Sequence, residues 1–179
     1  NLVALWQRRP EAPDALWHVR AKQVVLATGA IERPLVFPDN DRPGVMSAEA
    51  ALVYLRRHGI LVGERIVLAT NNDKAHAVAV ALREAGASVV VADTRQSAQT
   101  GADVRSGARI ESVHGTGGVK AVIVGGERIE ADCLLVSGGL TPTVHLFCQA
   151  GGKLRFDESI AAFVPRDPLP GIVVAGAAN

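Results

Sequence analysis

The sequence has 179 residues, of which 48% are hydrophobic and 21% are charged, so it can bury a sizeable core. Aromatic residues make up only 4%, and a core of Ala, Val and Leu is typical of parallel α/β sheets, whose strands are buried on both faces. The net charge is +1 and no basic run exceeds two residues, which excludes the electrostatic footprint of a nucleic-acid-binding protein.

The N-terminal part of the chain alternates strand-like and turn-like segments. Leu2–Trp6 and Leu16–Arg20 are expected to be strands joined by a proline-rich turn. Gln23–Ala27 has the profile of a buried strand and opens into a tight loop at Thr28-Gly29-Ala30. The stretch 32–44, rich in Pro, Asp and Asn, then predicts a solvated linker with a hinge.

A helix is expected between Ser47 and Gly59. Ser47 is a good N-cap and Gly59 a good C′ residue. Glu49 in the first turn and the basic residues 56–58 in the last turn complement the helix dipole.

A strand, a loop, a helix and a second strand follow directly. They are expected at Arg65–Ala69, Thr70–Asp73, Lys74–Ala85 and Ser88–Asp93. This order within about 30 residues predicts a βαβ unit with a right-handed crossover.

The pattern changes after residue 101. Short antiparallel strands are expected at Arg109–Val113, Val119–Val124 and Glu127–Glu130. A further apolar strand, Cys133–Val136, ends in a glycine-rich turn, and a last strand is expected at Ile172–Ala175. Residues 143–168 between them are expected to be irregular.

The loop of the βαβ unit is where a dinucleotide-binding protein carries its glycine fingerprint. Here Thr70, Asn72 and Ala75 occupy the three glycine positions, and only Ala75 is acceptable there. Asn72 places a side chain where a phosphate should approach the backbone, and either Asn72 or Asp73 serves as an N-cap. The Asp73 carboxylate would repel an anion at the helix N-terminus, a repulsion that Lys74 could partly offset by pairing with a phosphate.

Asp93 ends the second strand, eighteen residues after Ala75, where an acidic residue binds the adenosine ribose in dinucleotide-binding folds. It is also a common turn residue. Two interpretations remain: a dinucleotide site with contacts from Asn71, Asn72, Lys74 and Asp93, or a self-capped structural unit. The second is favoured.

Four segments carry a family resemblance: AKQVVLATGAIERPLVFPDNDRPGVM, ERIVLATNNDKA, SGGLTPT and GIVVAGAAN. Along nearly the whole chain the sequence resembles the α subunit of heterotetrameric sarcosine oxidase. The ATGA and GGLTP elements are shared by the wider pyridine-nucleotide-disulfide reductase-like group, so the GAIERPLVFPDNDRPGVM and TNNDKA segments are the more specific.

The resemblance implies an α/β, Rossmann-like three-layer dinucleotide-binding fold with a small antiparallel β-meander. Residues 1–43 and 140–179 would belong to an incomplete outer FAD/NAD-type domain, and 44–139 to an inserted NAD(P)-type domain. The parent complex would demethylate sarcosine oxidatively with oxygen as acceptor. In the family NAD lies on the α subunit, FMN lies at the subunit interface, and FAD lies in another subunit. The partners would therefore be the other subunits and a dinucleotide.

Three positions match the outer domain's cofactor contacts: Thr28 and Gly29 in ATGA, and Gly176 in the closing segment. Ala177 stands where the family group usually has an aspartate, which favours NAD over FAD in the outer domain. The glycine fingerprint of that domain is not in this sequence, and no catalytic residue of the family maps onto it. Because both ends of the chain run into strand-like sequence, we expect a segment of a longer protein.

The resemblance leaves other functions open. A degenerate scaffold or interface module that binds no cofactor stays open, as does membership of a related opine or amine oxidase complex. The five scattered histidines lack metal-ligand spacing, and the absence of CxxC argues against a thioredoxin-reductase-like enzyme. Two cysteines and no long apolar run predict a cytoplasmic protein without a membrane span, with Cys133 as a small buried hydrophobe.

Overall fold

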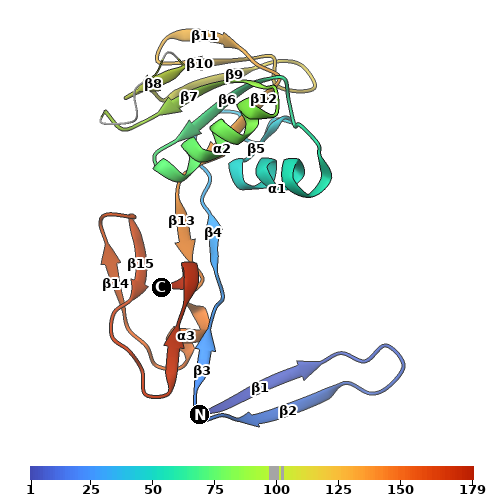
Figure 1. The fold of residues 1–179 in the computed structure, drawn as a ribbon, viewed down its shortest axis with the longest axis vertical. Coiled ribbons are helices and arrows are strands. Elements are labelled where there is room, and N and C mark those ends of the chain that lie inside the picture. The colour runs from blue at the N-terminus through green and yellow to red at the C-terminus, as the bar shows by residue number, and fades with distance from the viewer. Residues whose placement is uncertain (97–100, 102) are drawn as a thin grey trace. The chain divides into compact units, whose positions relative to one another are not determined.

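The computed structural model describes residues 1–96, 101 and 103–179, which form two compact units (Figure 1). Unit 1 comprises Asn1–Ile31 and Thr141–Asn179, and unit 2 comprises Glu32–Leu140. The chain passes between them along two short paired strands, β4 (Ala30–Glu32) and β13 (Leu140–Pro142).

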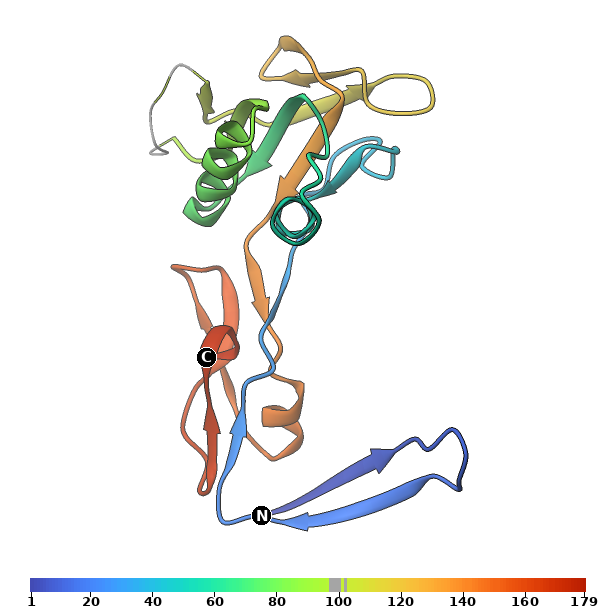
Figure 2. The ribbon, with the colours of Figure 1, turned by 45° about the vertical axis from the view of Figure 1, so that its right-hand side comes forward.

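Unit 2 is built on a five-stranded parallel sheet. Its strands, in spatial order, are β5 (Val45–Ser47), β12 (Cys133–Ser137), β6 (Arg65–Thr70), β7 (Ser88–Asp93) and β8 (Val104–Ser106). Helices α1 (Ala48–His58) and α2 (Asp73–Glu84) cover one face (Figure 2). The antiparallel strands β9 (Ile110–His114), β10 (Ala121–Val124) and β11 (Glu127–Glu130) cover the other.

Alternation along the central strands explains why the sheet has a core on each face. In β6, Ile66 and Leu68 pack towards the helices, whereas Val67 and Ala69 pack towards the antiparallel sheet. Successive strand residues point to opposite faces, so a continuous apolar run supplies both cores. The unit is therefore a mixed α/β structure of helices, parallel sheet and antiparallel sheet.

The two helices begin and end at the residues that favour these positions. Ser47 caps α1 by accepting a hydrogen bond from Ala50 N at 3.2 Å, and Gly59 ends it in the left-handed conformation with φ 64°. Asn72 caps α2 by accepting from Ala75 N at 3.3 Å. Both caps satisfy backbone donors that a helix leaves unpaired at its start.

Unit 1 consists of two-stranded pairings and short helices. The hairpin β1–β2 (Leu2–Gln7, Ala15–Arg20) and the pair β14–β15 (Leu154–Asp157, Ala162–Pro165) are antiparallel. Strands β3 (Val24–Leu26) and β16 (Ile172–Val174) pair in parallel. The helices are α3 (His145–Gln149) and the 3₁₀ turn η1 (Gly176–Ala178).

One expectation from the sequence was wrong. Residues 143–168 are not irregular, because α3, β14 and β15 lie in this stretch. These elements are too short, and their apolar residues too widely spaced, to show a hydrophobic period. The stretch 33–44 contains no helix or strand, as expected for a linker, and Asp39 and Asp41 are exposed, but Phe37 is buried in the core beneath the antiparallel sheet.

Two further features of the described chain bear on its class. Cys133 is buried, as expected, and burial raises the pKa of its thiol to about 11. Among the described residues, no helix is long and apolar enough to cross a bilayer.

Candidate functional site

The carboxyl ends of the parallel strands in unit 2 gather several polar residues. The chain visits β5, β6, β7 and β8 in one direction across the sheet, and α1 and α2 connect the first three of these strands on one face. It then returns through β9–β11 on the opposite face and places β12 between β5 and β6, so that the strand order turns back between β6 and β12. In open α/β sheets, ligands bind in the crevice outside the carboxyl ends at such a point.

The side chain of Asn72 bridges this crevice. Its Nδ2 donates to the carbonyl oxygen and to Oγ of Ser137, which ends β12, both at 3.2 Å. The same amide nitrogen lies 3.1 Å from Thr70 Oγ1 and 3.3 Å from Asn71 Oδ1. Asn72 therefore joins the ends of β6 and β12 where the fingerprint glycine would leave room for a phosphate.

Thr70 fixes the backbone of the same loop. Its Oγ1 accepts from Asn72 N at 3.1 Å and lies 3.2 Å from the Asn72 carbonyl oxygen. Thr70 is fully buried, so its hydroxyl requires these local partners. The tight turn that a first glycine would make is here built by a threonine side chain.

Asp93 lies at the end of β7 and is completely buried. Its Oδ2 lies 2.9 Å from His76 Nε2 on α2 and accepts from Arg95 Nη2 at 2.8 Å. Its Oδ1 accepts from Arg95 N at 2.9 Å and Arg95 Nε at 3.1 Å. Both oxygens are thus engaged within the protein, and this placement disfavours the predicted contact with a ribose.

Electrostatics stabilise this arrangement. Burial would raise the pKa of Asp93, but hydrogen bonds from Arg95 and His76 outweigh it, so the pKa lies below its ordinary value of 3.8. The hydrogen bond to Asp93 raises the pKa of Arg95, whose Nη2 also donates to Asp73 at 2.7 Å. An arginine between two carboxylates therefore covers the start of α2.

Lys74 points to a protein partner as well. Its Nζ lies 3.4 Å from Glu49 Oε1 on α1. Glu49 N in turn donates to Glu32 Oε2 at 2.9 Å, so Glu32 satisfies a free backbone donor at the start of α1. The sequence predicted Lys74 as a phosphate partner, and it did not place Glu32, Glu49 or Ser137 at this loop. Ser137 ends a strand parallel to β6, which is the signal that could have identified it.

A cavity of about 210 Å³ lies beside this loop within unit 2. Leu52, Ala75, Ala77, Val78, Gly139 and Leu140 line its apolar part. Glu32, Glu49, Arg56, Asn72, Lys74 and Ser137 line its polar part. The volume is smaller than the 300–1,000 Å³, roughly, of sites for drug-sized ligands.

The outer-domain residues come together at one end of another strand pair. Because β3 and β16 are parallel, with Leu26 opposite Val174, Thr28-Gly29 and Gly176 follow their carboxyl ends. Gly29 and Gly176 have φ of 71° and 70°, values that favour glycine, and neither has an atom within 4 Å of an added Cβ. Thr28 Oγ1 donates to the carbonyl oxygen of Thr143 at 2.6 Å.

Curated relatives match nearly the whole chain. It is 41% identical to the sarcosine oxidase alpha subunit of Corynebacterium sp. (strain U-96), over 92% of the chain and 19% of that protein. It is 32% identical to an opine oxidase subunit of Rhizobium meliloti, over 88% of the chain and 38% of that protein. No family model matches. The chain is homologous to sarcosine oxidase alpha subunits and spans 19% of the length of that relative.

Solved structures share the fold. L-proline dehydrogenase from P. horikoshii superposes with a TM-score of 0.73 at 29% identity, over 99% of this chain and 36% of that one. A FAD-dependent pyridine nucleotide-disulphide oxidoreductase from Desulfovibrio vulgaris superposes with a TM-score of 0.62 at 18% identity, over 90% of this chain and 47% of that one. The first of these neighbours is named as a dehydrogenase and the second as a FAD-dependent oxidoreductase, and the relatives are named as oxidase subunits.

Proposed function

We propose that this chain is an internal region of the α subunit of a sarcosine oxidase, which demethylates sarcosine oxidatively with oxygen as acceptor. The observation that carries the proposal is the 41% identity to a sarcosine oxidase alpha subunit over 92% of the chain, against 32% to an opine oxidase subunit. The partners would be the other subunits of the complex, in the cytoplasm. FAD and FMN would bind outside this region.

In this proposal residues 44–139 are an inserted Rossmann-like, three-layer domain that has kept its fold and replaced its nucleotide site. Support comes from the bridge between Asn72 and Ser137 and from the burial of Asp93 between His76 and Arg95. A dinucleotide would have to break both sets of bonds. The domain then serves as a scaffold, in which Asn71, Asn72 and Asp93 hold the loop and Lys74 pairs with Glu49.

The NAD of the parent protein would lie at the outer domain, formed in part by residues 1–43 and 140–179. Thr28, Gly29 and Gly176 are the proposed contacts, because they share the carboxyl end of the β3–β16 pair. Gly176 leaves open space where a cofactor can approach the backbone.

Substrate preference of the intact complex that contains this chain tests the activity. Sarcosine should yield hydrogen peroxide and consume oxygen in equal amounts. Activity with an opine but none with sarcosine would contradict this proposal and support an opine oxidase instead.

A matched glycine pair tests the NAD contact. Gly176→Val should lower the NAD content of the purified complex, whereas Gly151→Val should not. Both glycines have positive φ, of 70° and 92°, and open space around an added Cβ, so both substitutions strain the backbone similarly. An equal loss of NAD from both variants, or from neither, would contradict the assignment.

A further inference from the structure

The cavity beside the Asn72 loop has a composition that the proposed scaffold role does not use. Its apolar wall comes from Leu52 on α1, from Ala75, Ala77 and Val78 on α2, and from Leu140. Two basic and two acidic side chains line the same space: Arg56, Lys74, Glu32 and Glu49. Because the cavity combines an apolar wall with side chains of both charges, it suits a zwitterion with a short apolar body better than an anion or a cation.

The charged groups that line the cavity can exchange partners at a small cost in free energy. The ion pair between Lys74 and Glu49 spans 3.4 Å, and its side chains are 65% and 45% exposed. Such exposed pairs contribute little stability, because water screens both charges. A ligand carboxylate can therefore replace Glu49 on Lys74, and a ligand ammonium can replace Lys74 on Glu49.

Ser137 offers a fixed donor in the lining of the cavity. The residue is only 4% exposed, and its Oγ accepts from Asn72 Nδ2 at 3.2 Å. Within the described part of the chain its own hydroxyl proton meets no acceptor. A buried hydroxyl normally donates as well as accepts, so this proton is available to a ligand oxygen.

We propose that this cavity binds a small zwitterion with a short apolar body, the chemical class of an α-amino acid. The carboxylate would contact Lys74, Arg56 and the Ser137 hydroxyl, and the ammonium would contact Glu49 and Glu32. The volume of about 210 Å³ accommodates a ligand of this size.

Amide chemical shifts of the full ¹⁵N-labelled chain, titrated with L-valine, test the site. We expect saturable shifts at Ala77 and Ser137 with a millimolar dissociation constant. The analogues 3-methylbutanoate and 2-methylpropylamine each retain the body and one charge, and each should bind about tenfold more weakly. Absence of shifts with L-valine, or equal binding of either analogue, would overturn the proposal.

Two matched pairs of variants locate the binding. Arg56→Gln should weaken L-valine binding, whereas Arg57→Gln, its neighbour outside the cavity lining, should not. Ala77→Phe should fill the cavity and abolish binding, whereas Val80→Phe, at an exposed position of the same helix, should leave it unchanged. Unaltered binding to a folded Ala77→Phe chain would contradict the assignment of the cavity.

Discussion

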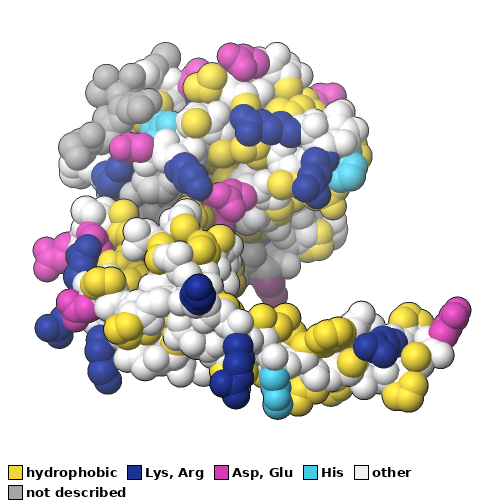
Figure 3. All heavy atoms as spheres, turned by 60° about the horizontal axis from the view of Figure 1, so that its bottom comes forward, with side chains coloured by type: hydrophobic (Ala, Val, Ile, Leu, Met, Phe, Trp, Pro, Cys, Tyr) yellow, Lys and Arg dark blue, Asp and Glu magenta, His cyan; other side chains and the backbone are white. Residues whose placement is uncertain are grey.

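Unit 2 and unit 1 differ in how far their apolar side chains are buried. In unit 2, the central strands β12 and β6 are buried on both faces, between helices and an antiparallel sheet. In unit 1, the β1–β2 hairpin exposes Leu2, Trp6, Leu16 and Trp17 by 51–74%, on a surface rich in apolar side chains (Figure 3). Unit 2 therefore carries its own core.

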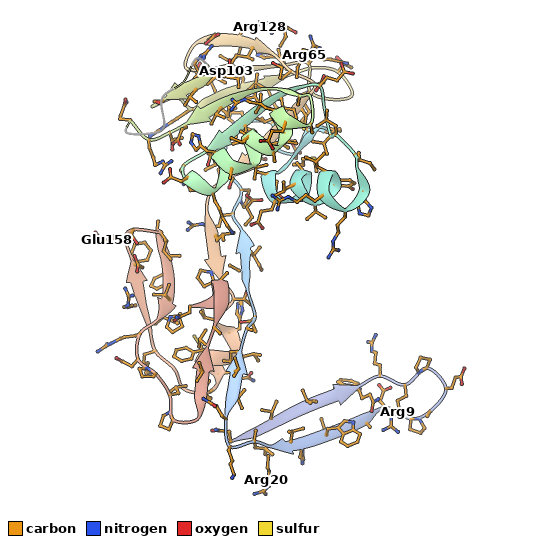
Figure 4. The ribbon with its side chains drawn as sticks, in the orientation of Figure 1. Arg9, Arg20, Arg65, Asp103, Arg128 and Glu158 are labelled. Atoms are coloured by element: carbon orange, nitrogen blue, oxygen red, sulfur yellow. The ribbon has the colours of Figure 1, made fainter. Side chains whose placement is uncertain are left out.

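The hairpin is apolar on both of its faces. Leu5 and Trp17 face each other across the strands, and so do Trp6 and Leu16 one position along. Neighbouring pairs point to opposite faces, and side chains project on both sides of the ribbon (Figure 4). Stability of unit 2 should thus depend on core packing, and the hairpin should contribute little.

The largest effect is expected from a truncation in the core of unit 2. Leu134→Ala should lower the free energy of unfolding by about 2–5 kcal/mol, because the fully buried side chain leaves a cavity behind it. Leu16→Ala in the hairpin, at 67% exposure, should change it by less than about 0.5 kcal/mol. Urea unfolding measures both values. Similar values would remove the contrast between the units.

The second largest effect on the free energy of unfolding is expected from loss of the Asp93 carboxylate. Asp93→Asn weakens the bonds to Arg95 and His76 and should cost about 2–3 kcal/mol of unfolding free energy. Asp103→Asn, an exposed carboxylate of the same unit, is the matched control and should be nearly neutral. If chemical denaturation gives equal effects for the two variants, the buried network does not stabilise the fold.

The same residue predicts a pH dependence. The pKa of Asp93 in the folded state is lowered from 3.8, so its contribution is fully present above that value. It is lost as the pH falls through the lower, folded-state pKa. The difference in unfolding free energy between wild type and Asp93→Asn should therefore be constant near neutrality and shrink below about pH 4. A difference that grows on acidification would reverse the assigned sign.

A smaller effect is expected where two segments of unit 2 approach closely. A Cβ on Gly138 would lie 2.9 Å from the Arg33 carbonyl oxygen and 3.0 Å from that of Pro34. Gly138→Ala should cost about 1–3 kcal/mol, because backbone must move. Gly118→Ala, with its nearest atom at 3.5 Å, should be tolerated in thermal melts. A tolerated Gly138→Ala would show that residues 33–34 are free to shift.

Local signals in the sequence were sufficient for much of unit 2. Caps and apolar spacing located α1 and α2, and continuous apolar runs located β6, β7 and β12. Strands β5 and β8 have three residues each, too few for a pattern, and β14 and β15 depend on pairing with each other.

The site was predictable only in part. The loss of the glycines and the cap at Asn72 could be inferred from the loop itself. The bridge to Ser137 and the contact of His76 with Asp93 could not, since they join residues 65 and 17 positions apart. In the sequence, Asp93 has the spacing of a residue that binds a ribose. Its burial and its hydrogen bond from Arg95 could be seen only in the structure.

Nucleotide binding tests the central claim that unit 2 has replaced its dinucleotide site. Calorimetric titration of the full chain with NAD and with NADP, followed by amide shifts, is the direct measurement. We predict no binding at sub-millimolar concentrations and no shifts at Asn72 or Ala75. A micromolar dissociation constant accompanied by shifts at these two amides would contradict the account.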